Sequence, residues 1–102
     1  MKLSETVDLM NSEEYGDRLI AEYLQACIRH ERLLTYLGPV SFTELSSLEN
    51  DRLITQLNIM SSYICILATR LKALDLYSKA CEIWEDLDEK KQNGCKTSFV
   101  GT

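Results

Sequence analysis

A heptad seam in the second half of the chain constrains the fold more than any other feature. Large apolar residues recur there at alternating spacings of three and four, which places them along one side of an α-helix. They are Leu57, Met60, Ile64, Leu67, Leu71 and Leu74. The stripe then drifts to Tyr77, Cys81, Trp84 and Leu87. The pattern predicts a long helix that must bury this side against another helix.

A second amphipathic helix is predicted upstream, over residues 11–37. Asn11 and Glu14 form a capping box at its start, where acidic side chains also favour the helix dipole. Gly38 and Pro39 are expected to end it, because glycine is a common C-terminal cap and proline cannot continue the hydrogen-bond ladder. This helix is the expected first arm of a helical hairpin.

The second arm is predicted over residues 41–91, beginning at a capping box of Ser41 and Glu44. It is expected either as one continuous helix or with a break in the stretch SSLEND. The predicted fold is therefore all-α: an antiparallel helical hairpin with a long second arm, in one domain over residues 1–92, with a flexible tail over residues 93–102. The first arm is too short to cover the second, so some of the apolar residues at its end are expected to face water unless another subunit packs there: Leu74, Tyr77, Cys81 and Trp84. A homo-oligomer is the simplest source of that cover.

Composition excludes several classes of function. The net charge of −5 over 102 residues disfavours binding to nucleic acid polymers or to anionic membranes, whereas a small anionic ligand needs only a few local arginines. No signal peptide or membrane span is expected.

The four cysteines have no close spacing and His30 is the only histidine, so no metal or cofactor is expected. Cys27, Cys65 and Cys81 are interpreted as small buried hydrophobes. Without a phosphate loop, a nucleophile elbow or a second histidine, a non-enzymatic protein is predicted.

One strip of the first helix carries candidate binding residues. At ~100° per residue, Tyr15, Arg18, Glu22 and Arg29 lie together beside the apolar side. A tyrosine ring can stack on a nucleobase and a guanidinium can take a phosphate through two hydrogen bonds. Tyr15 and Arg29 are ~21 Å apart along the helix, so one small ligand would reach both only across a subunit interface. From the residues alone, surface ion pairs beside a half-buried tyrosine remain the simpler interpretation.

The order of residues resembles a known family, the small phage proteins of the anti-CBASS and anti-Thoeris helical-hairpin type. The matching residues are Tyr15, Arg18, Glu22, Tyr23, Arg29, Leu33, Tyr36, Leu37, Phe42, Leu45, Gln56, Met60, Tyr63, Leu67 and Arg70. Each is weak by itself, but together they form an ordered set that spans over half of the chain.

The resemblance implies a sponge: a helical hexamer that binds cyclic oligonucleotide second messengers without cleaving them, in the cytoplasm of the infected bacterial host. Carried over by position, Tyr15 would stack on a base and Arg29 would hold a phosphate in cyclic dinucleotide pockets between subunits. Arg70 would serve a separate cyclic trinucleotide pocket, and Arg18 would either touch ligand or bond to Glu22. The family often has lysine in place of Arg29, and the extension after Leu76 is longer than expected, which leaves the assembly size open.

Two other functions remain. A ligand-free helical adaptor or inhibitor could bind a bacterial protein through the heptad seam. Hydrolysis of the messenger, in contrast, would destroy the ligand permanently.

Overall fold

Helices make up most of the part of the chain that the structure describes. The computed structural model describes the backbone of residues 1–44 and 47–92, and the side chains of residues 1–37 and 48–87. A 3-10 helix, η1 (Leu3–Thr6), precedes four α-helices, which are α1 (Val7–Met10), α2 (Tyr15–Glu44), α3 (Ser47–Ala73) and α4 (Tyr77–Gln92). No strand occurs among these residues, so the all-α prediction is confirmed. The predicted tail over residues 93–102 lies outside the described residues.

The capping box predicted for Asn11 and Glu14 is wrong, because α2 begins at Tyr15 and the Glu14 carbonyl accepts its first hydrogen bond, from the Arg18 N–H at 3.2 Å. The Ser12 hydroxyl accepts a hydrogen bond from the Glu14 backbone N–H at 3.0 Å and donates one to Asp17 Oδ2 at 2.8 Å. Serine at this position satisfies a backbone donor that has no partner inside the helix. Asn11 instead ends α1, where its N–H donates to the Val7 carbonyl.

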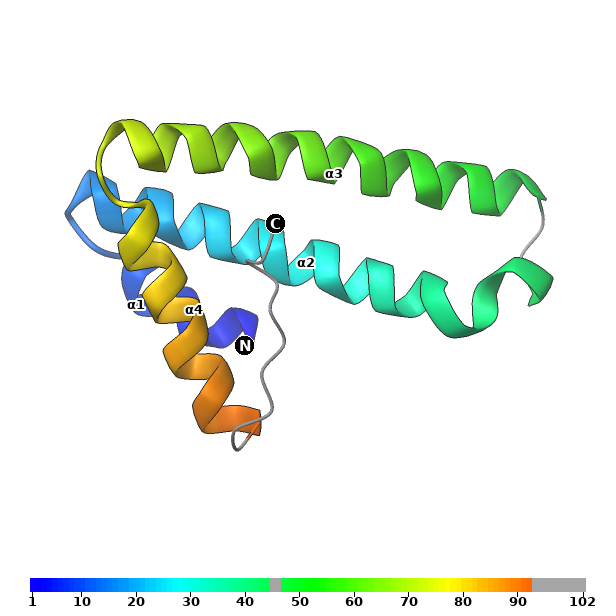
Figure 1. The fold of residues 1–102 in the computed structure, drawn as a ribbon, viewed down its shortest axis with the longest axis horizontal. Coiled ribbons are helices and arrows are strands. Elements are labelled where there is room, and N and C mark those ends of the chain that lie inside the picture. The colour runs from blue at the N-terminus through cyan, green and yellow to red at the C-terminus, as the bar shows by residue number, and fades with distance from the viewer. Residues whose placement is uncertain (45–46, 93–102) are drawn as a thin grey trace.

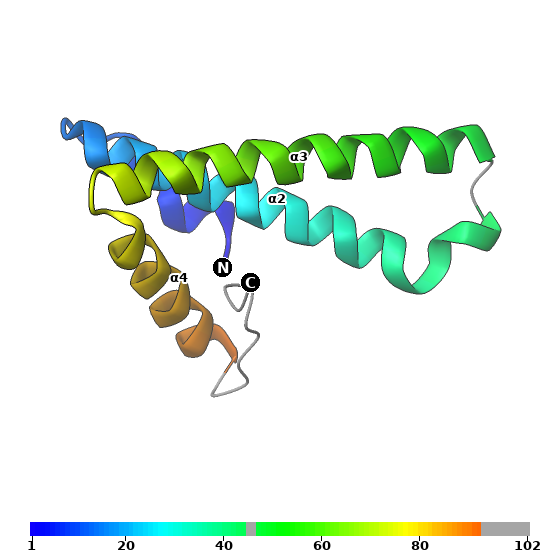
Figure 2. The ribbon, with the colours of Figure 1, turned by 45° about the horizontal axis from the view of Figure 1, so that its top comes forward.

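The predicted end of the first arm at residue 37 is wrong, because α2 continues through Gly38 and Pro39 to Glu44. Proline removes one backbone donor and crowds the preceding turn, which bends a helix when the flanking turns stay helical. The last turns of α2 do bend away from its axis before the connection at residues 45–46 (Figures 1 and 2). The predicted start of the second arm at residue 41 is also wrong, because residues 41–44 belong to α2 and α3 begins at Ser47. The side chains of the predicted capping box, Ser41 and Glu44, lie outside the described ones.

Helices α2 and α3 lie side by side along the longest dimension of the molecule (Figures 1 and 2). The centre of the heptad seam packs as predicted, with Leu67 and Leu71 fully buried. The opposite side of α3 is also apolar, since Ile59 and Ile66 are exposed. Apolar residues therefore lie on two sides of this helix, and α2 covers only one of them.

A sharp turn separates α3 from α4, so the predicted continuous second arm is wrong. Asp75 adopts a left-handed conformation with φ of 59°. The Leu76 N–H donates to the Leu71 carbonyl at 2.8 Å, and the Asp75 N–H donates to the Lys72 carbonyl at 3.1 Å. These two bonds form a Schellman motif, which ends a helix by satisfying its last carbonyls. The motif normally has glycine where Asp75 stands, so the sequence gives no warning of the turn.

The turn lets α4 fold back onto the start of α2 (Figure 1). Tyr77 meets Tyr23 edge to face, with ring centroids 5.9 Å apart. The Lys72 ammonium lies 4.8 Å from the centre of the Tyr77 ring, and Lys79 pairs with Asp17 at 3.6 Å. These contacts fix the first turn of α4 against both long helices.

Trp84 is buried by its own chain, with only 3% of its surface exposed. The expectation of a solvent-facing end is therefore wrong for Trp84, because the Schellman turn redirects α4 into the core, and it is confirmed for Leu74, which is 48% exposed. The buried core cluster combines Met1 with residues of α2, α3 and α4, and comprises Met1, Leu19, Ile20, Tyr23, Leu24, Ala26, Cys27, Ile28, Leu67, Leu71, Ala80 and Trp84. The interpretation of the cysteines as buried is correct for Cys27, wrong for Cys65, which is exposed, and correct only in part for Cys81, which is half-buried.

Candidate functional site

The best candidate binding surface begins where α2 starts beside the end of α3. Tyr15, in the first turn of α2, is 53% exposed. Arg70, in the last turn of α3, donates a hydrogen bond from Nη2 to the Tyr15 phenol oxygen. The structure thus brings together an aromatic ring and a guanidinium that are 55 residues apart in sequence. The sequence resemblance had placed these two residues in separate pockets.

A second pair of side chains joins the same two helices further along. The Tyr63 hydroxyl of α3 donates a hydrogen bond to Glu22 Oε2 of α2. This bond raises the pKa of Tyr63, because it favours the phenol that keeps its proton, while the positive charge of Arg70 acts in the opposite direction. Sequence reasoning did not choose Tyr63 as a site residue, and the signal available was its seven-residue spacing from Arg70.

The two pairs repeat with heptad spacing. Glu22 follows Tyr15 by seven residues and Tyr63 precedes Arg70 by seven, which corresponds to ~10 Å along each helix. Two helices that run in opposite directions keep such pairs in register on one side of their interface. We call the surface formed by Tyr15, Glu22, Tyr63 and Arg70 the tyrosine face.

Arg18 is turned toward the start of α2. Its Nη1 donates to the Ser12 backbone carbonyl at 2.9 Å, so it supports the turn that precedes Tyr15. The alternative in which Arg18 bonds to Glu22 is not observed, because the hydrogen bond to Glu22 comes from Tyr63. The side chain of Arg18 is nonetheless exposed next to Tyr15 on the same helix.

Arg29 lies one heptad beyond Glu22 and is exposed. The register that pairs Tyr15 with Arg70 and Glu22 with Tyr63 places it opposite Gln56. No hydrogen bond or ion pair to Arg29 occurs within the part of the chain that the structure describes. Its guanidinium therefore extends the tyrosine face with an unpaired positive charge, ~21 Å along α2 from Tyr15.

The other edge of the α2–α3 interface is chemically different. His30 Nε2 is 2.9 Å from the Ser61 hydroxyl oxygen, which makes His30 a partly buried packing residue with a hydrogen-bond partner. Among the described residues, no group of three or more histidine, cysteine, aspartate or glutamate side chains could hold a metal ion.

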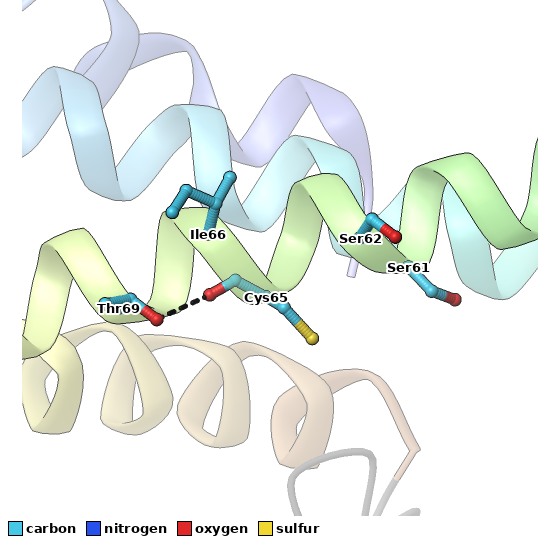
Figure 3. A pocket seen from close by; sticks show the side chains of 5 residues that line it. All are labelled: Ser61, Ser62, Cys65, Ile66 and Thr69. Carbon is cyan, nitrogen blue, oxygen red and sulfur yellow. Dashed lines mark hydrogen bonds between the residues drawn. The ribbon is translucent and has the colours of Figure 1, made fainter.

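A shallow hollow of about 410 Å³ lies along α3, and its lining begins at Ser61, the residue that contacts His30 of α2. Among the described residues its lining is small or apolar: Ser61, Ser62, Cys65, Ile66 and Thr69 (Figure 3). The Thr69 hydroxyl donates to the Cys65 carbonyl of its own helix at 3.0 Å. This lining has no charged group, so the hollow lacks a guanidinium or ammonium to pair with a phosphate, and the tyrosine face remains the better candidate.

Comparisons with known proteins bear on this surface. The Sequestin family model matches residues 13–73, a segment of more than half of the chain that contains both pairs of the tyrosine face. No protein matched in the comparisons with curated proteins and with solved structures. None of the described helices combines the length and apolar character needed to cross a membrane. The match agrees with the sponge proteins that the sequence resembles and indicates a sequestering role. This chain belongs to the Sequestin family.

Proposed function

We propose that the protein is a phage anti-defence sponge, which binds cyclic di- and trinucleotide second messengers of a bacterial immune system and holds them without cleavage. It would act in the cytoplasm of the infected host. The observation that carries this proposal is the exposed Tyr15 ring held by Arg70 on a surface inside the Sequestin match.

The chemistry of the tyrosine face suits such a ligand. Stacking of a base on an exposed aromatic ring contributes ~1–3 kcal/mol. Arg70 uses one Nη2–H on Tyr15, and its other N–H groups remain to bind a phosphate. The hydrogen bond also fixes the orientation of the Tyr15 ring, which lowers the entropy lost when a ligand binds.

A second subunit would complete the site by bringing Arg29 next to the Tyr15 of a neighbour. The outer side of α3 supports such an assembly. No charged residue occurs between Arg52 and Arg70, and Ile59 and Ile66 are 64% and 53% exposed. Apolar surface of this kind commonly marks a protein interface. We therefore propose a homo-oligomer, with the hexamer of the resembling proteins as its expected size, in which a symmetric interface presents each tyrosine and arginine more than once.

Calorimetry with cyclic di- and trinucleotides tests the proposal directly. Tyr15→Ala and Arg70→Ala are each expected to weaken binding at least tenfold, from the lost stacking and the lost charge-assisted bonds. Arg29→Ala is expected to weaken cyclic dinucleotide binding, whereas Arg32→Ala, an exposed arginine of the same helix, is the matched control. Native mass spectrometry gives the subunit number and the ligand stoichiometry together.

Sequestration also predicts that intact ligand is recovered when the complex is heated. Recovery of a linear or hydrolysed nucleotide would show that the protein cleaves its ligand and is an enzyme. If the wild type binds no cyclic nucleotide, the proposal is wrong.

The helical adaptor is the second candidate. The heptad seam predicted as its binding surface is buried at Leu67 and Leu71, but the exposed Ile59 and Ile66 favour an adaptor that binds through the outer side of α3. An adaptor would inhibit the host defence equally well after Tyr15→Ala but would lose activity after Ile59→Glu. A sponge that loses ligand binding on Tyr15→Ala would lose its activity with it. A plaque assay on defended and undefended hosts separates the two outcomes.

A further inference from the structure

The Glu22–Tyr63 pair has a chemistry that phosphate binding does not explain. Glu22 is partly buried at the α2–α3 interface, and Tyr63 is 44% exposed. The Tyr63 hydroxyl holds the Glu22 carboxylate through Oε2. Within the described residues no hydrogen bond to Oε1 is found, so one carboxylate oxygen has its full capacity to accept from a ligand.

A negative charge is an unexpected neighbour for a ligand made of phosphates. The backbone positions of Tyr15 and Arg70 lie one heptad from those of Glu22 and Tyr63, however, which is ~10 Å along each helix. A carboxylate at this distance fits a base and not a phosphate. A base stacked on the exposed ring of Tyr63 would extend its edge past the phenol oxygen, toward the Glu22 carboxylate.

The two purines differ at that edge. Guanine presents two adjacent donors, N1–H and N2–H₂, and both can donate to one carboxylate. Adenine presents one donor, N6–H₂, beside N1, an acceptor whose lone pair would face the carboxylate oxygen. An ionised glutamate can only accept hydrogen bonds, so it complements guanine and repels adenine.

We propose that Tyr63 and Glu22 form a guanine-specific base subsite, in which Tyr63 stacks on the base and orients the carboxylate that reads its edge. This inference rests on the proposed sponge function and specifies its ligand class, namely cyclic dinucleotides that contain guanine.

The test compares a cyclic dinucleotide carrying two guanines with one carrying two adenines, by calorimetry. The wild type is expected to bind the guanine ligand at least tenfold more tightly, within the range for a two-bond base contact. Glu22→Gln is expected to weaken guanine binding about tenfold and to strengthen adenine binding severalfold, because a glutamine amide offers one acceptor and one donor. Tyr63→Phe is expected to keep the stacking and to reduce the guanine preference.

Glu85→Gln, a charge change on the exposed side of α4, is the matched control and should leave both affinities unchanged. Circular dichroism of each variant checks that the fold is intact. If Glu22→Gln weakens both ligands equally, or neither, the subsite is refuted while the sponge function stands. If the wild type binds no cyclic nucleotide at all, the function and the subsite are both refuted.

Discussion

Replacing Trp84 tests whether α4 is part of the domain core or waits for a partner subunit. A buried aromatic side chain removes roughly 150–250 Å² from water, worth about 4–6 kcal/mol at ~25 cal/mol per Å². Measured aromatic-to-alanine changes cost about 3–5 kcal/mol. Because Trp84 is 3% exposed, Trp84→Ala should lower the free energy of unfolding by about 3–5 kcal/mol, a large part of the roughly 5–15 kcal/mol of a typical domain. Trp84→Phe should cost about 1–2 kcal/mol and still fold.

Urea unfolding followed by circular dichroism measures these losses, with Leu74→Ala as the control at a half-exposed leucine. Trp84 is also the only tryptophan of the chain, so its fluorescence reports its surroundings. Its emission should stay blue-shifted, relative to the urea-unfolded chain, on dilution from micromolar to nanomolar concentration. If the emission shifted to the red on dilution while the helical signal persisted, Trp84 would be covered by a partner, and the reasoning would be wrong.

Three further predictions concern the turn, the core and the outer side of α3. Asp75→Gly should stabilise the protein by roughly 0.5–1 kcal/mol in urea unfolding, because glycine adopts the φ of 59° without a steric penalty; a loss of stability of that size would argue against the Schellman turn. Burial raises the pKa of the Cys27 thiol from 9.0 to about 12 and also raises that of Tyr23. As the pH rises, both groups therefore lose their protons first in the unfolded chain. The free energy of unfolding should be constant below about pH 9 and then fall toward pH 12, by at most about 1.4 kcal/mol per pH unit for each group. Cys27→Ala should remove the part of this fall that begins near pH 9. Iodoacetamide should alkylate Cys65 in the native protein and spare Cys27, and equal labelling of both, read by peptide mass spectrometry, would contradict their assigned burial.

The helices and their apolar sides could be predicted from residue spacing, but the places where helices end could not. Gly38 and Pro39 are strong local stop signals, yet α2 continues through them. Asp75 is no such signal, yet α3 ends beside it. Burying Leu76 and Trp84 favours the turn, and that gain exceeds the cost of a left-handed aspartate.

The candidate site was predictable in part. Tyr15, Arg18 and Arg29 lie on one strip of α2, as their angular positions require, and the strip is exposed. The contact between Tyr15 and Arg70, and the pairing of Glu22 with Tyr63, depend on the register of α2 against α3. Heptad spacing on each helix is compatible with several registers, so these partners could not be chosen from the sequence.

The sequence by itself determined that the chain forms long amphipathic helices and that tyrosine and arginine side chains share one strip, because both follow from the period of an α-helix. Only the tertiary structure decided that α4 returns to bury Trp84, and that Arg70 and Tyr63 join Tyr15 and Glu22 on one face. These outcomes depend on contacts between residues far apart in the chain, where the burial of apolar surface outweighs local preference.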